Sequence, residues 1–368
     1  MAIVTRYFST TSAGAGDGTS WADRAALLSA GAFSTVITGF NFSGSDSLQV
    51  AVGPGTYTVT TGLTTGAFSN APTANNPIIW HGCDSSGVLL SPSDPNWTSD
   101  LPAWDDSTLP VLETTTNIAT ITGTTTGWYY RLIKFTASGR QGAILSNVAG
   151  MDWCVVANTT SNNNTINIHN PGVSLFNCVL TTSGSGYSSI VSGTITVNAW
   201  NCRLVGVAGS TGNRHGFSNS SSSSSIRLCT IISVGGHGIS ITTSGSTQVF
   251  DCTILNCGGA GVSAPGLVMG SYIANCGTYG IDASLTGNSQ CFGSRLRDNT
   301  AGNFNGSGNF YNSQNYTTDS DDTEFVNSAA GNYQIKSSAT IWGQGFGVSE
   351  QASGALLMPL TFGGGFNQ

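Results

Sequence analysis

The sequence is short of charge: 8% of its 368 residues are Asp, Glu, Lys or Arg, and the formal net charge is −7. The 11 Lys and Arg residues are scattered along the chain rather than gathered in one region. Nucleic-acid binding normally uses a basic patch or stripe, so we expect no nucleic-acid partner. The chain also lacks a run of 18 apolar residues, so we expect no membrane span.

Helix-forming residues are scarce as well. With 49 glycines, abundant Ser, Thr and Asn, and few Glu, Lys or Arg, the composition excludes an α-solenoid. The opening residues do not combine a basic region with an apolar run and a cleavage site. We therefore expect synthesis in a host cytoplasm, no export by the general secretory route, and cysteines that remain free thiols.

What the chain does contain is a short repeated phrase, clearest between residues 150 and 300. Each copy has Cys or Ser at one position, which we call the thiol slot, and an aliphatic residue two positions later. Neighbouring copies are 19 to 27 residues apart. Repeats of this length are typical of solenoids, in which each copy stacks on the next. The thiol slots are Cys154, Cys178, Cys202, Cys229, Cys252, Ser271 and Ser294.

The pattern around the thiol slot predicts a strand. The aliphatic residue two positions later, from Val156 to Leu296, is expected to point inward. The intervening residue, from Val155 to Arg295, is expected to face solvent. The residue four positions after the slot is predicted to be a turn, since it is usually Asn, Ser, Thr, Gly or Asp. A second predicted turn column contains Gly216, Gly238, Gly261 and Gly280.

One such rung, about 22 residues long with two or three short strands, cannot bury its own apolar side. Stacked about 4.8 Å from a copy of itself, it can, and like residues then form columns. Small, apolar Cys suits a column of this kind, and stacked Asn side chains can hydrogen-bond between rungs. The sequence therefore predicts an all-β fold, a parallel β-helix.

The predicted organisation has three parts. Residues 1–45 form an N-terminal strand and a cap, with a helix at 21–28 that starts from Ser20 as N-cap with Asp23 in a capping-box position. Residues 46–347 form the β-helix, with an insertion between early rungs at 85–115. Residues 348–368 form a non-repeat C-terminal arm that packs on a partner or on the last rung.

Several phrases resemble right-handed parallel β-helix proteins of the pectin-lyase-like group, including those found in phage spike and decoration proteins. They cover roughly residues 6–347, and the resemblance implies a right-handed helix. It implies little about function, because the group contains lyases, hydrolases, adhesins and phage spikes. The phrases lie at residues 16–21, 50–57 and 76–79, and, near the end, at 325–333 and 343–345.

The phrase Gly236-His237-Gly238 matches one found in the polygalacturonase branch of that group. Here no Asn-Thr-Asp precedes it, no pair of acids lies on a nearby rung, and His215 occupies the same column one rung earlier. Paired-carboxylate hydrolysis needs two acids over one sugar, so we interpret His237 as a corner residue.

Two groups of residues resemble metal sites only in part. A pectate-lyase-like calcium site would need several acids on neighbouring rungs and an Arg base. Its nearest approach is Asp282, Asp298, Arg295 and Arg297, where both acids occupy turn columns. Cys257 and Cys276 are interpreted as a second short column rather than a zinc site with Cys252. We assign no catalytic, cofactor-binding or metal-binding residue.

Other acidic residues are also interpreted as structural. Asp105 and Asp106 are adjacent, so as strand neighbours they would point to opposite faces. The remaining acids form a turn that we interpret as a solvated loop: Asp319, Asp321, Asp322 and Glu324.

The function expected from these observations is a non-enzymatic virion structural protein, a phage capsid-decoration or spike or fibre-like protein on the particle surface. We expect a homotrimer, as closed cyclic symmetry suits a rod on a symmetric surface. Its expected partners are other virion proteins, through the N-terminus and residues 349–368, and host surface glycans. The alternatives are a polysaccharide-binding or polysaccharide-degrading tail spike, with a site between chains, and a cell-surface adhesin.

Overall fold

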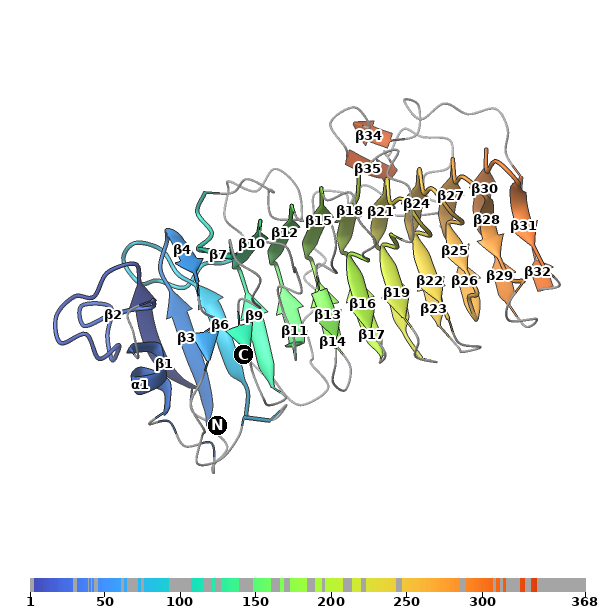
Figure 1. The fold of residues 1–368 in the computed structure, drawn as a ribbon. Coiled ribbons are helices and arrows are strands. Elements are labelled where there is room, and N and C mark those ends of the chain that lie inside the picture. Colours follow the sequence, from blue (N-terminus) through green and yellow to red (C-terminus); the bar gives the residue numbers. More distant parts are fainter. Residues whose placement is uncertain are drawn as a thin grey trace.

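The chain forms an all-β, right-handed parallel β-helix in which three long sheets run along one axis (Figure 1). The structure is a computed structural model of the whole chain. It describes residues 3–306 except 29–31, 39, 41, 43–45, 61–62, 65–71, 74–75, 93–106, 115–120, 123–126, 139–147, 160–165, 169–172, 184–188, 194–195, 208–213, 220–222, 243–246 and 285–288, and beyond them residues 309–311, 314–315, 325–327 and 332–335.

Sheet A holds thirteen of the described strands and extends over the length of the stack. Every pair of neighbours in it is parallel. Its strands, in spatial order, are β2 (Ala25–Ala26), β1 (Ile3–Ser9), β3 (Ser47–Val52), β6 (Ile78–Gly82), β9 (Trp128–Arg131), β11 (Val148–Asp152), β14 (Val173–Phe176), β17 (Val197–Trp200), β20 (Ser225–Arg227), β23 (Gln248–Phe250), β26 (Leu267–Met269), β29 (Gln290–Phe292) and β32 (Asn309–Tyr311).

Sheets B and C complete each rung, and their described strands are also parallel. Sheet B contains β4 (Thr56–Val59), β7 (Val111–Thr114), β10 (Lys134–Ala137), β12 (Val155–Asn158), β15 (Val179–Thr182), β18 (Arg203–Val205), β21 (Thr230–Ile232), β24 (Thr253–Leu255), β27 (Tyr272–Ala274), β30 (Arg295–Arg297) and β33 (Gln314–Asn315). Sheet C contains β13 (Ile166–Ile168), β16 (Val191–Gly193), β19 (Phe217–Asn219), β22 (Ile239–Ile241), β25 (Val262–Ser263), β28 (Tyr279–Asp282) and β31 (Gly302–Asn305), and β5 (Leu63–Thr64) pairs separately with β8 (Ile121–Thr122).

The thiol slots form one buried column between sheets A and B, as the repeat predicts. In all seven slots the thiol or hydroxyl donates a hydrogen bond to the carbonyl oxygen two residues earlier, at 3.1 to 3.4 Å. Ser fits where Cys fits because both are small donors. Burial raises the pKa of the Cys178 and Cys229 thiols well above the usual value. All nine cysteines are free and buried.

The aliphatic column two residues further on also points inward. Its seven members are fully buried, and neighbours such as Leu204 and Ile231 are directly paired from rung to rung. Each contributes the transfer free energy of a buried aliphatic side chain, about 1.5–3 kcal/mol. This column and the thiol column together line the core of the central rungs.

The sharp corner that joins sheet A to sheet B lies at the residue before the thiol slot. From Trp153 to Gly293 this residue has φ between 49° and 60°, in the left-handed region. Its amide donates to a carbonyl oxygen of the next rung, as in Asn201 to Arg227 at 3.0 Å. Asn and Gly tolerate this conformation, whereas Leu228 and Trp153 adopt it at a cost. The Asn201 side chain also donates to Asn177 at 2.9 Å, which confirms a rung-to-rung Asn pair.

The predicted turn four residues after the thiol slot is confirmed only in the later rungs. Ser233, Asn256, Asn275 and Asp298 have φ between 51° and 56°. In the earlier rungs, Asn158 and Thr182 still belong to strands β12 and β15. The sheet B strands of those rungs are therefore one residue longer than those that follow.

The residue directly after the thiol slot was expected to face solvent, and this is wrong in every copy except Arg203, which is partly exposed. Val155 and Val179 form a separate buried cluster outside sheet B with Leu109 and Leu132. Further along, Tyr272 and Arg295 are fully buried, with the guanidinium carbon 5.7 Å from the centre of the Tyr ring. Strand alternation gives the direction of a side chain, but it does not say whether another segment covers that face.

The N-terminal cap is present, but its helix is not the one expected. Residues 21–28 form turns and β2, whereas α1 spans Ala32–Thr38. The Asp23 amide donates to the Ser20 hydroxyl at 3.1 Å, as in a capping box, and that hydroxyl donates to the Asp23 carboxylate at 2.9 Å, yet these bonds close a single turn. Phe33 of α1 packs on Phe8 and on Trp80, with ring centroids 5.7 and 5.1 Å apart, and so closes the core at its N-terminal end.

The described strands also refine the outer parts of the prediction. β1 lies in sheet A between β2 and β3, so the first strand belongs to the stack. The expected insertion falls within one rung, between β6 and β7, with 93–106 outside the described residues. β34 (Phe325–Asn327) and β35 (Asn332–Ile335) form an antiparallel pair apart from the three sheets. The predicted arm at 348–368 also lies outside the described residues.

The corner geometry predicts that Leu228→Asn stabilises the protein. Asn adopts the left-handed region more readily than Leu, and it extends the Asn177–Asn201 pair, so we expect a gain of about 1 kcal/mol in the free energy of unfolding. Chemical denaturation measures the change, with Leu228→Ala as the control. An equal gain in both variants would trace the effect to removal of the Leu228 side chain and contradict a role for the left-handed preference of Asn.

Candidate functional site

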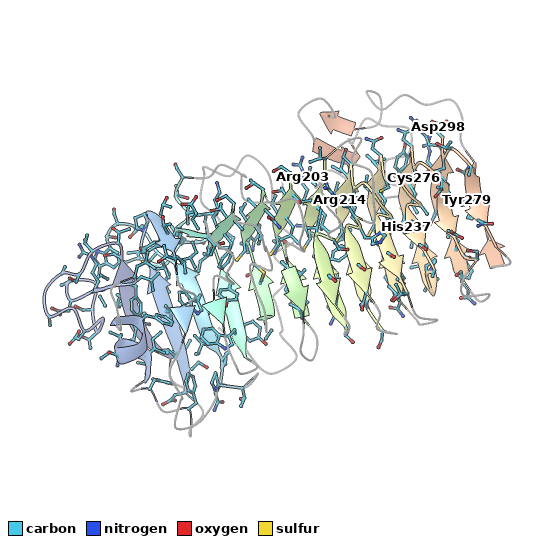
Figure 2. The ribbon with its side chains drawn as sticks, in the orientation of Figure 1. Arg203, Arg214, His237, Cys276, Tyr279 and Asp298 are labelled. Carbon is cyan, nitrogen blue, oxygen red and sulfur yellow. The ribbon has the colours of Figure 1, made fainter. Side chains whose placement is uncertain are left out.

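The Gly-His-Gly phrase forms a stacked pair of imidazoles at the corner before sheet C. The rings of His215 and His237 lie 5.1 Å apart and are parallel within 4°. Nδ1 of His215 accepts a hydrogen bond from the His237 amide at 3.0 Å, and Nδ1 of His237 accepts one from the Ala260 amide at 2.9 Å. Each ring thus satisfies a backbone donor of the next rung. Figure 2 shows His237 among the later rungs.

These histidines stay neutral at ordinary pH. Burial and the neighbouring His237 lower the pKa of His215 to about 4, and burial also lowers the pKa of His237. A neutral imidazole whose Nδ1 accepts a hydrogen bond from a backbone N–H carries its own proton on Nε2. Built Cβ atoms on Gly236 and Gly259 would come within 2.8 Å of the imidazoles, so glycine lets the rungs approach. The His pair therefore acts as part of the corner.

The acids and arginines considered for a calcium site do not form one group. Asp282, on sheet C, accepts hydrogen bonds from the Ser284 amide at 3.1 Å and the Asn305 side chain at 3.0 Å. Asp298, at the corner after sheet B, pairs with Arg297 at 3.0 Å. Arg295 lies over Tyr272 on the outer face of sheet B. Each carboxylate serves its own turn.

The second cysteine column is present. Cys257 and Cys276 lie against each other in neighbouring rungs, both buried. Among the described residues, no three His, Cys, Asp or Glu side chains are grouped to hold a metal ion. Within the same ranges, no helix is long and apolar enough to cross a membrane. The acidic residues expected at 105–106 and 319–324 lie outside the described residues.

A polar cluster that the sequence did not reveal lies on the outer face of sheet A. His81, Arg131 and Asp152 stand side by side on β6, β9 and β11. Arg131 pairs with Asp152 at 3.4 Å. His81 is held by Gln49 at 3.2 Å and by the Leu90 carbonyl oxygen at 3.0 Å.

The cluster has the shifted pKa values often found at reactive sites. Burial raises the pKa of Asp152 to about 6, although Arg131 and a hydrogen bond from Asn177 act in the opposite direction. Burial and Arg131 lower the pKa of His81 to about 4. Asp152 is only 5% exposed, and its two oxygens face Arg131 and Asn177. Both oxygens are thus engaged within the protein rather than open to a ligand.

The repeat could have located this cluster. Ile133 occupies the thiol slot of its rung, and Leu132 has the corner conformation with φ of 56°. Counting back two residues from that slot gives Arg131, and the same count from Cys154 gives Asp152. The place of this rung in the repeat is hidden in the sequence because Ile133, an aliphatic residue, occupies the thiol slot.

Comparison with known proteins adds no relative. No family model, no curated protein and no solved structure matches the chain.

The His pair predicts a difference between two substitutions. His215→Ala leaves the buried amide of His237 without its acceptor, so we expect a loss of about 1–3 kcal/mol in unfolding free energy. His215→Asn places an oxygen near the Nδ1 position and should retain most of the stability. Denaturation at pH 7.5 compares them, and equal losses would argue against the role of the Nδ1 acceptor.

Asp152 predicts a pH-dependent effect. Its pKa is raised to about 6 from 3.8, so the folded protein binds this proton more tightly than the unfolded chain. The ionised carboxylate therefore destabilises the folded state increasingly as pH rises from 3.8 to about 6. Above that range its destabilising effect is complete. Asp152→Asn should stabilise the protein at pH 7.5 by about 2–3 kcal/mol more than at pH 4. The comparison uses unfolding free energies of both proteins, and a difference independent of pH would contradict it.

Proposed function

We propose that this chain is a non-enzymatic structural protein of a virus particle, a decoration, spike or fibre-like β-helix on the particle surface. One observation carries the proposal: the stack is continuous in sheets A and B from the first rungs to β32 and β33. Among the described residues, the His215–His237 pair and the carboxylates of Asp282 and Asp298 are bonded within the corners of the stack. A long, self-supporting rod is suited to shape and spacing.

The bonding of the candidate residues supports this function over catalysis. The imidazoles accept hydrogen bonds from backbone amides, Asp282 and Asp298 are bonded to their own turns, and the buried Asp152 is paired with Arg131. A catalytic acid or base has to reach the proton that it transfers. Here the two imidazoles and Asp152 face the protein, which favours a structural role for them.

A homotrimer is part of the proposal. Trimers with cyclic symmetry present three equivalent rods to a symmetric surface, and the arm at 349–368 offers apolar residues for contacts with other virion proteins. The acidic balance of the chain favours solubility at high local concentration.

The proposal predicts a particle-bound trimer without turnover. Gel filtration with light scattering on the full chain should give three times the chain mass. Immunogold microscopy of purified particles, with an antibody to the chain, should label their surface. A monomer that never appears on particles would contradict the structural role, and release of reducing or unsaturated sugars from a polysaccharide panel would contradict the absence of catalysis.

A further inference from the structure

A continuous column of large side chains lies on the outer face of sheet A. It occupies the position two residues before the thiol slot, on six consecutive strands from β14 to β29. Neighbours are paired directly, so the side chains stand one above another at the rung spacing of about 4.8 Å. We call this column the aromatic stripe: Phe176, Trp200, Arg227, Phe250, Met269 and Phe292.

The stripe reaches solvent. Met269 is 43% exposed, and its other members are partly buried, which is the state of rings that present an edge or a face. Arg227 continues the stripe, because its guanidinium carbon lies 4.7 Å from the centre of the Phe250 ring. The core does not need these side chains, as the inward positions of the same strands are filled by Leu175, Ala199 and their equivalents.

A second outward column runs beside the stripe, two residues earlier on each strand. Asn198 and Gln290 are exposed, and the rest are partly exposed. Amides and hydroxyls both donate and accept hydrogen bonds, so this column offers both kinds of group at every rung but one. The column consists of Ser174, Asn198, Ser225, Gln248, Leu267 and Gln290.

We infer that this face binds a neutral, linear polysaccharide whose chain lies along the aromatic stripe. A sugar ring has an apolar face of C–H groups and a rim of hydroxyls. The stripe can pack on the first, and the Asn, Gln and Ser column can hydrogen-bond to the second. A net charge of −7 disfavours acidic polymers. The inference does not depend on the virion role, so either can fail alone.

The width of the stripe favours such a ligand over a second copy of the chain. Six rungs extend about 24 Å, and two adjacent columns are roughly 10 Å wide, which gives on the order of 240 Å². A stable protein interface buries about 800 Å² on each partner. A narrow stripe of this length matches an extended chain of about five sugars.

The test is titration calorimetry of the full chain with neutral cello- and chito-oligosaccharides of two to six sugars, and with oligogalacturonates of the same lengths. Affinity for one neutral series should rise with length up to about five sugars and then level off, since the aromatic stripe spans six rungs. The oligogalacturonates should bind more weakly. This length dependence needs no variant, so it is independent of folding effects.

Variants locate the binding site. The double variant Trp200→Ala/Phe250→Ala should weaken binding roughly tenfold, while the control Val88→Ser, an exposed apolar residue away from the stripe, should leave it unchanged. Three results would overturn the inference: no binding to either neutral series, tighter binding of oligogalacturonate, or self-association that the double variant abolishes while no sugar binds.

Discussion

Registered stacking of parallel strands is the constraint on which the structure depends. Once Leu204 is paired with Ile231, the other residues of β18 and β21 are also placed over their counterparts. An inward position that is buried in one rung is then buried in the next as well, so any polar group there has to find a hydrogen-bond partner in every rung. The thiol column shows the consequence. At all seven slots a small donor, a thiol or a hydroxyl, donates a hydrogen bond to the carbonyl oxygen two residues earlier. Repetition in the sequence is thus the direct record of repetition in the packing.

The same constraint explains why the two histidines and Asp152 are bonded within the stack. His215 and His237 are stacked because their rungs are stacked, and each imidazole takes the amide of the next rung as its donor. Asp152 is buried in its column, and Arg131 only partly offsets the cost of burying its charge. The pKa of Asp152 therefore rises to about 6. In a solenoid, a shifted pKa can follow from burial in a column as readily as from the demands of catalysis.

How far the sequence reveals the fold depends on whether a feature repeats. The thiol and aliphatic columns were predictable because each appears in every copy. The buried state of Tyr272 and Arg295 was not, since cover on the outer face of sheet B does not come from the repeat. The helix at Ala32–Thr38 was hidden by Ser, Thr, Val and Ile, which favour helices weakly, while Ser20 and Asp23 made their hydrogen bonds without a helix. The His81, Arg131 and Asp152 cluster was missed because Ile133 conceals the phase.

Inward and outward columns differ in what they can tell about function. An inward column must be apolar and well packed, so its composition is explained once the fold is known. An outward column that reaches solvent, unlike the covered one on sheet B, is under no such demand, and polar residues there would serve solubility better than rings. The fold alone therefore does not explain the large side chains of Phe176, Trp200 and Phe250, nor the neighbouring column of Ser, Asn and Gln. Since stacking sets both columns parallel to the rod axis, a partner that uses them has to be long, narrow and periodic, which is the shape of an extended polymer.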